Sequence, residues 1–94
     1  MAGTRRYVVV DERDNVATVV EKLMEGEAVE KNADKIKLLR DIPEGHKFAL
    51  SLIPKGSYVV KYGEWIGRAT RDIHAGDHVH VHNVDDIVDE VRKL

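Results

Sequence analysis

Three histidines alternate with valines near the end of the sequence, in the run His78, Val79, His80, Val81 and His82. A β-strand points successive side chains to opposite faces, so a strand here places the three imidazoles in one row. Imidazole transfers protons near neutral pH and is the commonest metal ligand among side chains. The row therefore predicts a catalytic or metal-binding site. The alternative is an exposed strand face without a role.

The rise of a strand limits which histidines can share a ligand. Neighbours in the row lie roughly 7 Å apart at Cα, so two of them can hold one metal ion or one anionic substrate. The outer pair lies roughly 13 Å apart on a flat strand and cannot meet at one ion. We expect His80 and His82 as metal ligands, completed by a ligand from elsewhere. His46 follows a turn glycine and either joins the row from a neighbouring strand or stays an exposed turn residue.

The composition restricts the classes of function. With 94 residues and 43% hydrophobic side chains, the chain is expected to form a single small domain over residues 1–94, with little room for a deep private pocket. The absence of cysteine excludes disulfides, thiolate metal sites and a cysteine nucleophile. A formal charge of -2 and 5% aromatic residues argue against nucleic acid as a partner. No run of membrane-spanning length and no signal segment is present, so we expect a cytoplasmic protein without a membrane partner.

Short strands joined by tight turns are predicted for most of the chain, which favours a mostly β fold. Residues 16–24 fit either a strand or a short helical turn. Strands are expected over residues 5–10, 27–30, 35–39, 47–50 and 58–60. Four segments share the order aliphatic, two variable residues, glycine, polar, and each predicts a buried anchor followed by a turn with positive φ at glycine. These segments are residues 23–27, 42–46, 53–57 and 73–77.

Two further elements are expected in the second half of the chain. Tyr62 and Gly63 predict the turn of a hairpin, and Gly67 in its second arm predicts a bulge or a close backbone approach. The last residues predict a short amphipathic C-terminal helix with Asn83 as its N-cap. The apolar face of that helix consists of Val84, Ile87, Val88, Val91 and Leu94.

Four motifs stand in a fixed order: GHKFAL at 45–50, KYG at 61–63, IGRAT at 66–70 and GDHVHVHN at 76–83. Together they closely resemble the N-terminal domain of the altronate and galactarate dehydratase family, strongly over residues 41–84 and more loosely before. The resemblance implies a SAF domain, whose β-clip fold wraps bent hairpins and short strands into a small barrel-like body. The long catalytic region of the family does not follow, so we expect a separately encoded small subunit rather than an excised domain.

The resemblance further implies a hydro-lyase that removes water from a sugar acid such as altronate. By family habit it uses a divalent metal, iron(II), held by or shared with a large catalytic dehydratase subunit. The small chain alone would then be inactive, and a homo-oligomer stays open.

In such a reaction, proton transfer or metal ligation falls to the histidines at positions 46, 78, 80 and 82. Lys61 and Arg68 beside the hairpin turn suit the substrate carboxylate, and their alternative is an ordinary solvated hairpin. Two other functions stay open. One is a non-catalytic carbohydrate-binding or assembly module, and the other is the alpha subunit of a sulfolactate sulfo-lyase.

Overall fold

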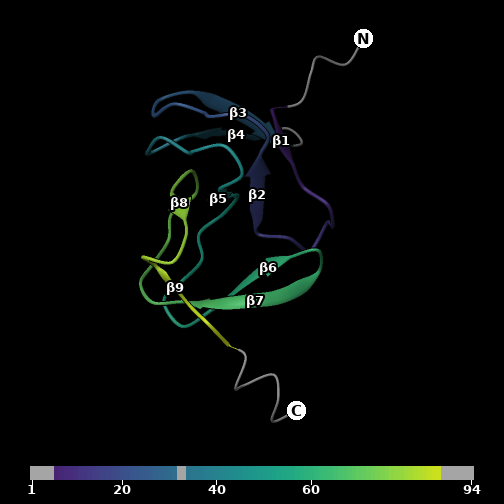
Figure 1. Ribbon diagram of the computed structural model, residues 1–94, viewed down its shortest axis with the longest axis vertical. Helices are drawn as coiled ribbons and strands as arrows, with labels where there is room; N and C mark the ends of the chain where they lie inside the picture. Colours follow the sequence, from purple (N-terminus) through teal and green to yellow (C-terminus); the bar gives the residue numbers. More distant parts are fainter. Residues whose placement is uncertain (1–5, 32–33, 88–94) are drawn as a thin grey trace.

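The computed structural model describes residues 6–31 and 34–87, which form nine short strands and no helix (Figure 1). The predicted mostly β class is therefore confirmed. No helix able to cross a membrane is found in this part of the chain. The strands are β1 (Tyr7–Val8), β2 (Val16–Val19), β3 (Ala28–Lys31), β4 (Asp34–Lys37), β5 (Lys47–Ala49), β6 (Tyr58–Lys61), β7 (Glu64–Ala69), β8 (His78–Val79) and β9 (Val84–Asp85).

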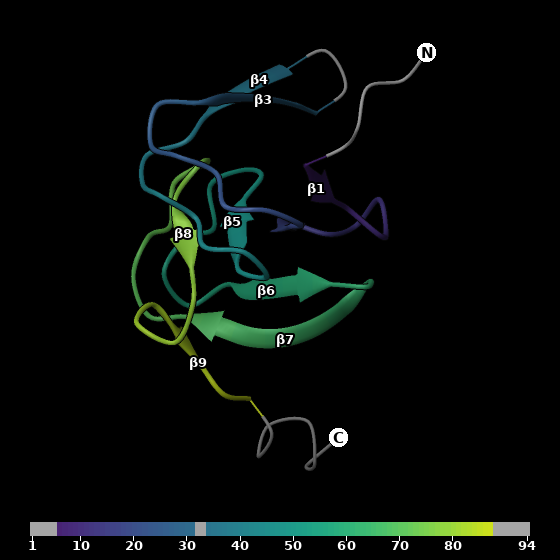
Figure 2. The same ribbon diagram turned by 45° about the horizontal axis from the view of Figure 1, so that its top comes forward.

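The strands pair into three small antiparallel sheets. The first has the order β1-β2-β5-β8, the second contains β3 and β4, and the third has the order β6-β7-β9. Phe48 of β5 lies opposite His78 of β8. Figure 2 shows β5 and β8 side by side, with the β3–β4 hairpin beyond one end and the β6–β7 hairpin beyond the other. The first sheet thus joins β5 and β8, whose paired residues lie 30 and 32 positions apart in the sequence.

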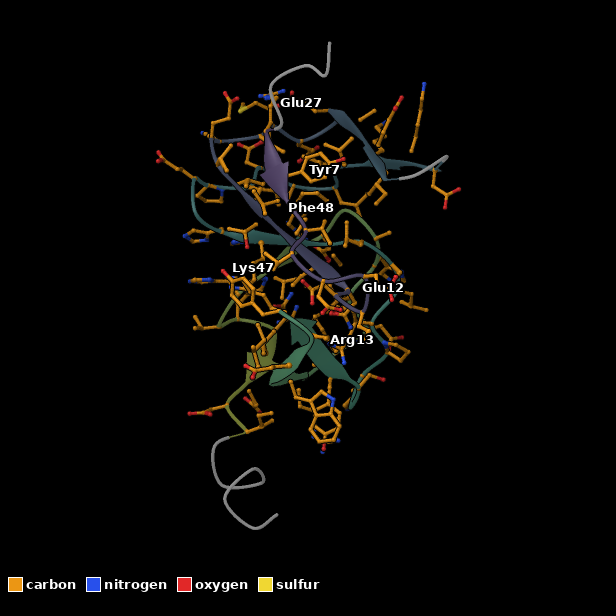
Figure 3. The ribbon with its side chains drawn as sticks, turned by 90° about the vertical axis from the view of Figure 1, so that its right-hand side faces the viewer. Tyr7, Glu12, Arg13, Glu27, Lys47 and Phe48 are labelled. Carbon is orange, nitrogen blue, oxygen red and sulfur yellow. The ribbon has the colours of Figure 1, made fainter. Side chains whose placement is uncertain are left out.

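Two apolar clusters form the core, and β5 runs between them. Phe48 packs into the first cluster and the adjacent Ala49 into the second, as alternation along a strand requires. Tyr7 contacts Phe48 edge to face with ring centroids 5.7 Å apart, and both side chains lie together in Figure 3. Val79 of β8 belongs to the second cluster. The strands that carry the histidines are therefore fixed by core packing on both sides.

The four predicted turns are confirmed, and their anchors pair with each other. Leu23 pairs with Ile42 and Ile53 with Ile73, and all four side chains are at most 1% exposed. The turn glycines share a φ between 80° and 90°, and they are Gly26, Gly45, Gly56 and Gly76. At Gly76 a side chain would also collide with the Lys37 carbonyl oxygen, so this turn requires glycine for space as well as for φ.

The β6–β7 hairpin contains the irregularity predicted at Gly67. Val59 pairs with Gly67, but Val60 already pairs with Trp65, so the register shifts by one residue. A Cβ on Gly67 would collide with the Val84 side chain, which packs against the bare backbone. Gly67 therefore both belongs to a bulge and permits a close approach, the two uses expected of a glycine inside a strand.

The predicted C-terminal helix is wrong where the structure describes it. Val84 and Asp85 form β9, with Val84 opposite Ala69 and Asp85 opposite Arg68. Asn83 is no helix cap but a buried side chain, 2% exposed. The contact of Val84 with the hairpin overrides the helical spacing of the local sequence. The remaining positions of the expected apolar face, at 88, 91 and 94, lie outside the described residues.

Candidate functional site

His46 joins the predicted histidine row from the neighbouring strand. It lies directly before β5, where its carbonyl oxygen accepts a 2.9 Å hydrogen bond from the Val19 N–H. Because β5 pairs with β8, the His46 ring comes next to His78, and His46 Nδ1 and His78 Nε2 lie 2.8 Å apart at hydrogen-bond distance. One of the two nitrogens must carry a proton for this bond. Of the alternatives for His46, the structure shows the half-buried position within the row.

A buried asparagine bends the row into a cluster. The strand β8 ends at Val79, and residues 81–83 form a turn. The Asn83 Oδ1 accepts a 3.0 Å hydrogen bond from the His80 N–H, and Asn83 Nδ2 donates a 2.8 Å bond to the His78 carbonyl oxygen. The flat strand expected over residues 78–82 is therefore wrong beyond Val79. In this turn the Asn83 side-chain amide supplies the hydrogen bonds that a neighbouring strand would otherwise make with the backbone of His78 and His80.

Three imidazoles consequently stack together, and the fourth lies tilted beside them. The ring centroids of His46 and His80 lie 4.3 Å apart, those of His46 and His78 5.0 Å, and those of His78 and His80 5.5 Å. The His82 ring lies 5.2 Å from that of His78, so the outer pair of the row meets after all. We refer to His46, His78, His80 and His82 as the histidine cluster. His82 is exposed and the other three are half-buried.

Three members of the cluster have the geometry of a metal-ligand set. His46, His78 and His80 each offer one ring nitrogen, and these nitrogens lie within 4.8 Å of one another. Two nitrogens bound to one ion at about 2.1 Å are at most about 4.2 Å apart, so small ring rotations would complete the set. Imidazole nitrogens suit zinc, iron, copper and nickel. The residues thus fit a divalent transition metal, and the structure groups His80 with His46 and His78 rather than with His82.

The surroundings keep two of these imidazoles neutral. Burial first, and then the charges of His46, His82 and His80, lower the pKa of His78 from 6.5 to about 4. The pKa of His80 is lowered as well, by burial first and then by the charges of His46, Lys47 and His82. Neutral imidazole is the form that accepts a proton or binds a metal, so the cluster is prepared for either task near neutral pH.

The depressed pKa of His78 predicts an acid-sensitive fold. Between about pH 6.5 and about pH 4 the unfolded chain protonates this residue and the folded chain does not, so stability is lost as the pH falls through that window. Urea unfolding of the chain in chelator at several pH values measures the slope. His78→Gln should make the slope shallower in that window, because the titrating group is gone. Identical slopes for both chains would contradict the assignment.

Lys61 and Arg68, the expected carboxylate ligands, are engaged with the hairpin. The Arg68 guanidinium donates to the Gly56 carbonyl oxygen at 2.7 Å and to the Tyr58 hydroxyl at 2.8 Å, and it lies 4.5 Å from the Tyr58 ring centroid. The Lys61 Nζ lies 4.8 Å from the Tyr62 ring centroid. These contacts tie both side chains to the hairpin and the turn before it, and the ring contacts of the histidine cluster involve neither of them.

Lys47 is a candidate that the sequence interpretation passed over. It is half-buried and lines a groove of about 270 Å³ together with His80. Burial first, and then the charge of Lys61, lower the pKa of the Lys47 ammonium. A lysine within a strand usually projects into solvent, so the residue type alone did not indicate a functional role. No local signal placed Lys47 beside His80, because that neighbourhood depends on the pairing of β5 with β8.

The geometry defines a small antiparallel β domain that presents a histidine cluster beside a groove. The sequence model of the family described as altronate/galactarate dehydratase SAF domain matches residues 5–87. The chain therefore belongs to the altronate/galactarate dehydratase SAF domain family, and the resemblance drawn from the four motifs is confirmed.

Relatives of this chain include whole enzymes and a separate subunit. The chain is 46% identical over 78 residues to altronate dehydratase of Escherichia coli (strain K12), covering 83% of this chain and 16% of that protein. It is 37% identical over 79 residues to altronate dehydratase of Bacillus subtilis (strain 168), covering 84% of this chain and 16% of that protein. It is 51% identical over 43 residues to (2R)-sulfolactate sulfo-lyase subunit alpha of Paracoccus pantotrophus, covering 46% of this chain and 64% of that subunit. The chain thus spans only a small part of the dehydratases.

Proposed function

We propose that this chain is a small subunit of a sugar-acid dehydratase, such as an altronate dehydratase, and contributes its histidine cluster to an active site completed by a large catalytic partner. The observation that carries the proposal is the gathering of four imidazoles from two chain segments, at the start of β5 and along and after β8, three of them stacked. Membership in the dehydratase family supports the reaction class. The sulfo-lyase alpha subunit supports the separate chain, since a related domain there occurs in a protein named as a subunit.

Dehydration of a sugar acid requires two proton transfers. A base removes the proton beside the carboxylate, an acid protonates the departing β-hydroxyl as water, and the resulting enol becomes the 2-oxo acid. His78 and His80 are both held neutral and suit either the base or a metal ligand, but a ring nitrogen that binds a metal cannot also take up this proton. The exposed His82 is placed to carry the proton that the leaving hydroxyl takes.

A divalent metal fits the proposal and is assigned to three residues. His46, His78 and His80 would hold it, and we propose iron(II) as its identity. When bound, such an ion supplies a positive charge that stabilises the enolate of the substrate. His82, outside this set, stays free for proton transfer. The 2.8 Å contact between His46 and His78 shows how close two of the ligand nitrogens already lie.

Co-expression with a large dehydratase chain that lacks its own SAF domain tests the proposal. We expect dehydration of altronate or galactarate only by the pair, in the presence of iron(II), and none by the 94-residue chain alone. Activity from the large chain that this chain leaves unchanged would sink the proposal and favour an assembly module. Turnover of sulfolactate instead of sugar acids would favour a sulfo-lyase subunit, for which the 51% identity to a subunit alpha is the specific support.

A further inference from the structure

The groove beside the histidine cluster has a divided chemical character. Its volume of about 270 Å³ is near the lower end of small-ligand sites. Ile66 and Val81, which are 39% and 81% exposed, give the groove an accessible apolar part. Lys47 and His80 provide cationic or hydrogen-bonding groups, and the carboxylates of Asp85 and Asp86 also line the groove.

Lys47 has no ion-pair partner among the described residues. Among residues 6–31 and 34–87 the ion pairs involve Arg6, Arg13 and Arg40, and none involves Lys47. The other charge that acts on it is the positive charge of Lys61. An ammonium that is half-buried without a counter-ion favours an external anion, and the apolar neighbours strengthen the attraction.

The remaining groups restrict what that anion can be. A simple anion gains nothing from Asp85 and Asp86, whose carboxylates repel it. Hydroxyl groups on the same molecule can donate to the Asp85 carboxylate, while its acidic group binds the lysine. The groove therefore suits a hydroxy acid, with the acidic end at Lys47 and the hydroxylated body toward Asp85.

We infer that Lys47 binds the acidic group, carboxylate or sulfonate, of the hydroxy acid that the histidine cluster acts on. This inference rests on the proposed function, since it places the substrate of that same site. It assigns Lys47 a binding role, next to the histidine cluster. His80 lines the same groove, so Lys47 and one imidazole of the histidine cluster face the same bound molecule.

Calorimetric titration of the 94-residue chain with galactarate, in chelator and at low salt, tests the inference. Lys47→Met keeps the aliphatic stem over Val79 and should weaken binding roughly tenfold or more, because a charged hydrogen bond is lost. Lys47→Arg keeps the charge and should restore most of the binding. Lys35→Met on the exposed β4 strand is the matched control and should bind as the natural chain does. Rising salt should weaken binding by the natural chain but hardly affect Lys47→Met.

Further measurements identify the ligand and distinguish a failure of this inference from a failure of the proposed function. Titration with sulfolactate in parallel shows whether a sulfonate or a carboxylate is preferred. Binding of neither acid, or equal affinities for the natural chain and Lys47→Met, would overturn the inference. In an active pair, Lys47→Met should raise KM more than it lowers kcat. An unchanged KM, while His80→Gln is inactive, defeats this inference alone, whereas full activity of the His80 variant defeats the proposed function.

Discussion

Replacement of His80 by glutamine should lower the dehydration rate of the assembled pair by roughly 10²- to 10⁴-fold, the usual contribution of a positioned acid or base. His80 lies against His46 with ring centroids 4.3 Å apart, and its depressed pKa keeps it neutral. Glutamine preserves a polar side chain of similar length but can neither transfer the proton nor replace imidazole as a metal ligand. The measurement is kcat with altronate or galactarate for the purified pair.

His74→Gln is the matched control for this loss. His74 is an exposed histidine of a turn, and within the described residues its ring contacts none of the cluster rings. Its replacement should leave kcat unchanged. Size-exclusion chromatography shows whether each variant still assembles. An assembled His80 variant with full activity would show that the histidine cluster takes no part in chemistry.

Replacement of Asn83 by alanine should destabilise the chain by about 2–3 kcal/mol. The buried side chain makes two hydrogen bonds, from the His80 N–H and to the His78 carbonyl oxygen. Alanine leaves both backbone groups without these partners. Because the same bonds bend the chain after β8, the variant should also separate the His82 ring from that of His78. Urea unfolding measures the first effect, and NMR contacts between the imidazole protons measure the second.

Val81→Ala in the same turn provides the comparison. Val81 is 81% exposed, and its truncation should change the free energy of unfolding by less than about 0.5 kcal/mol. Equal stabilities of the two variants would show that Asn83 contributes nothing specific. A stable Asn83→Ala chain that keeps the ring contacts would show that core packing alone shapes the turn.

The turns were the most predictable part of the fold. An aliphatic anchor and a glycine three positions later are local signals, because positive φ is a property of single residues. The pairing of anchors, Leu23 with Ile42 and Ile53 with Ile73, depends instead on how distant turns meet, and no local pattern reports it. The C-terminal helix failed for the same reason. Val84 follows helical spacing, but it packs over Gly67 from a distant strand.

Part of the candidate site was also predictable. Alternation placed His78 and His80 together, and the turn glycine before His46 allowed its approach from another strand. The sequence suggested no bend after Val79, because asparagine, the residue type at position 83, is favoured both at helix N-caps and in turns. Lys47 was missed because the side chains along a groove belong to different strands. Its partial burial depends on β5 lying between β2 and β8.

The β3–β4 hairpin has a consequence for solubility. Within the described residues these strands pair only with each other, so each keeps one edge on which another chain could add a strand. Only Val29 and Ile36 are buried there, and the exposed positions include Glu30, Lys35 and Lys37. Glu30 lies opposite Lys35, which neutralises the pair across the hairpin. A strand of another chain that paired with either edge would place its side chains against these charges. The charges therefore oppose aggregation, although the backbone groups of both edges have no strand partner within the described residues.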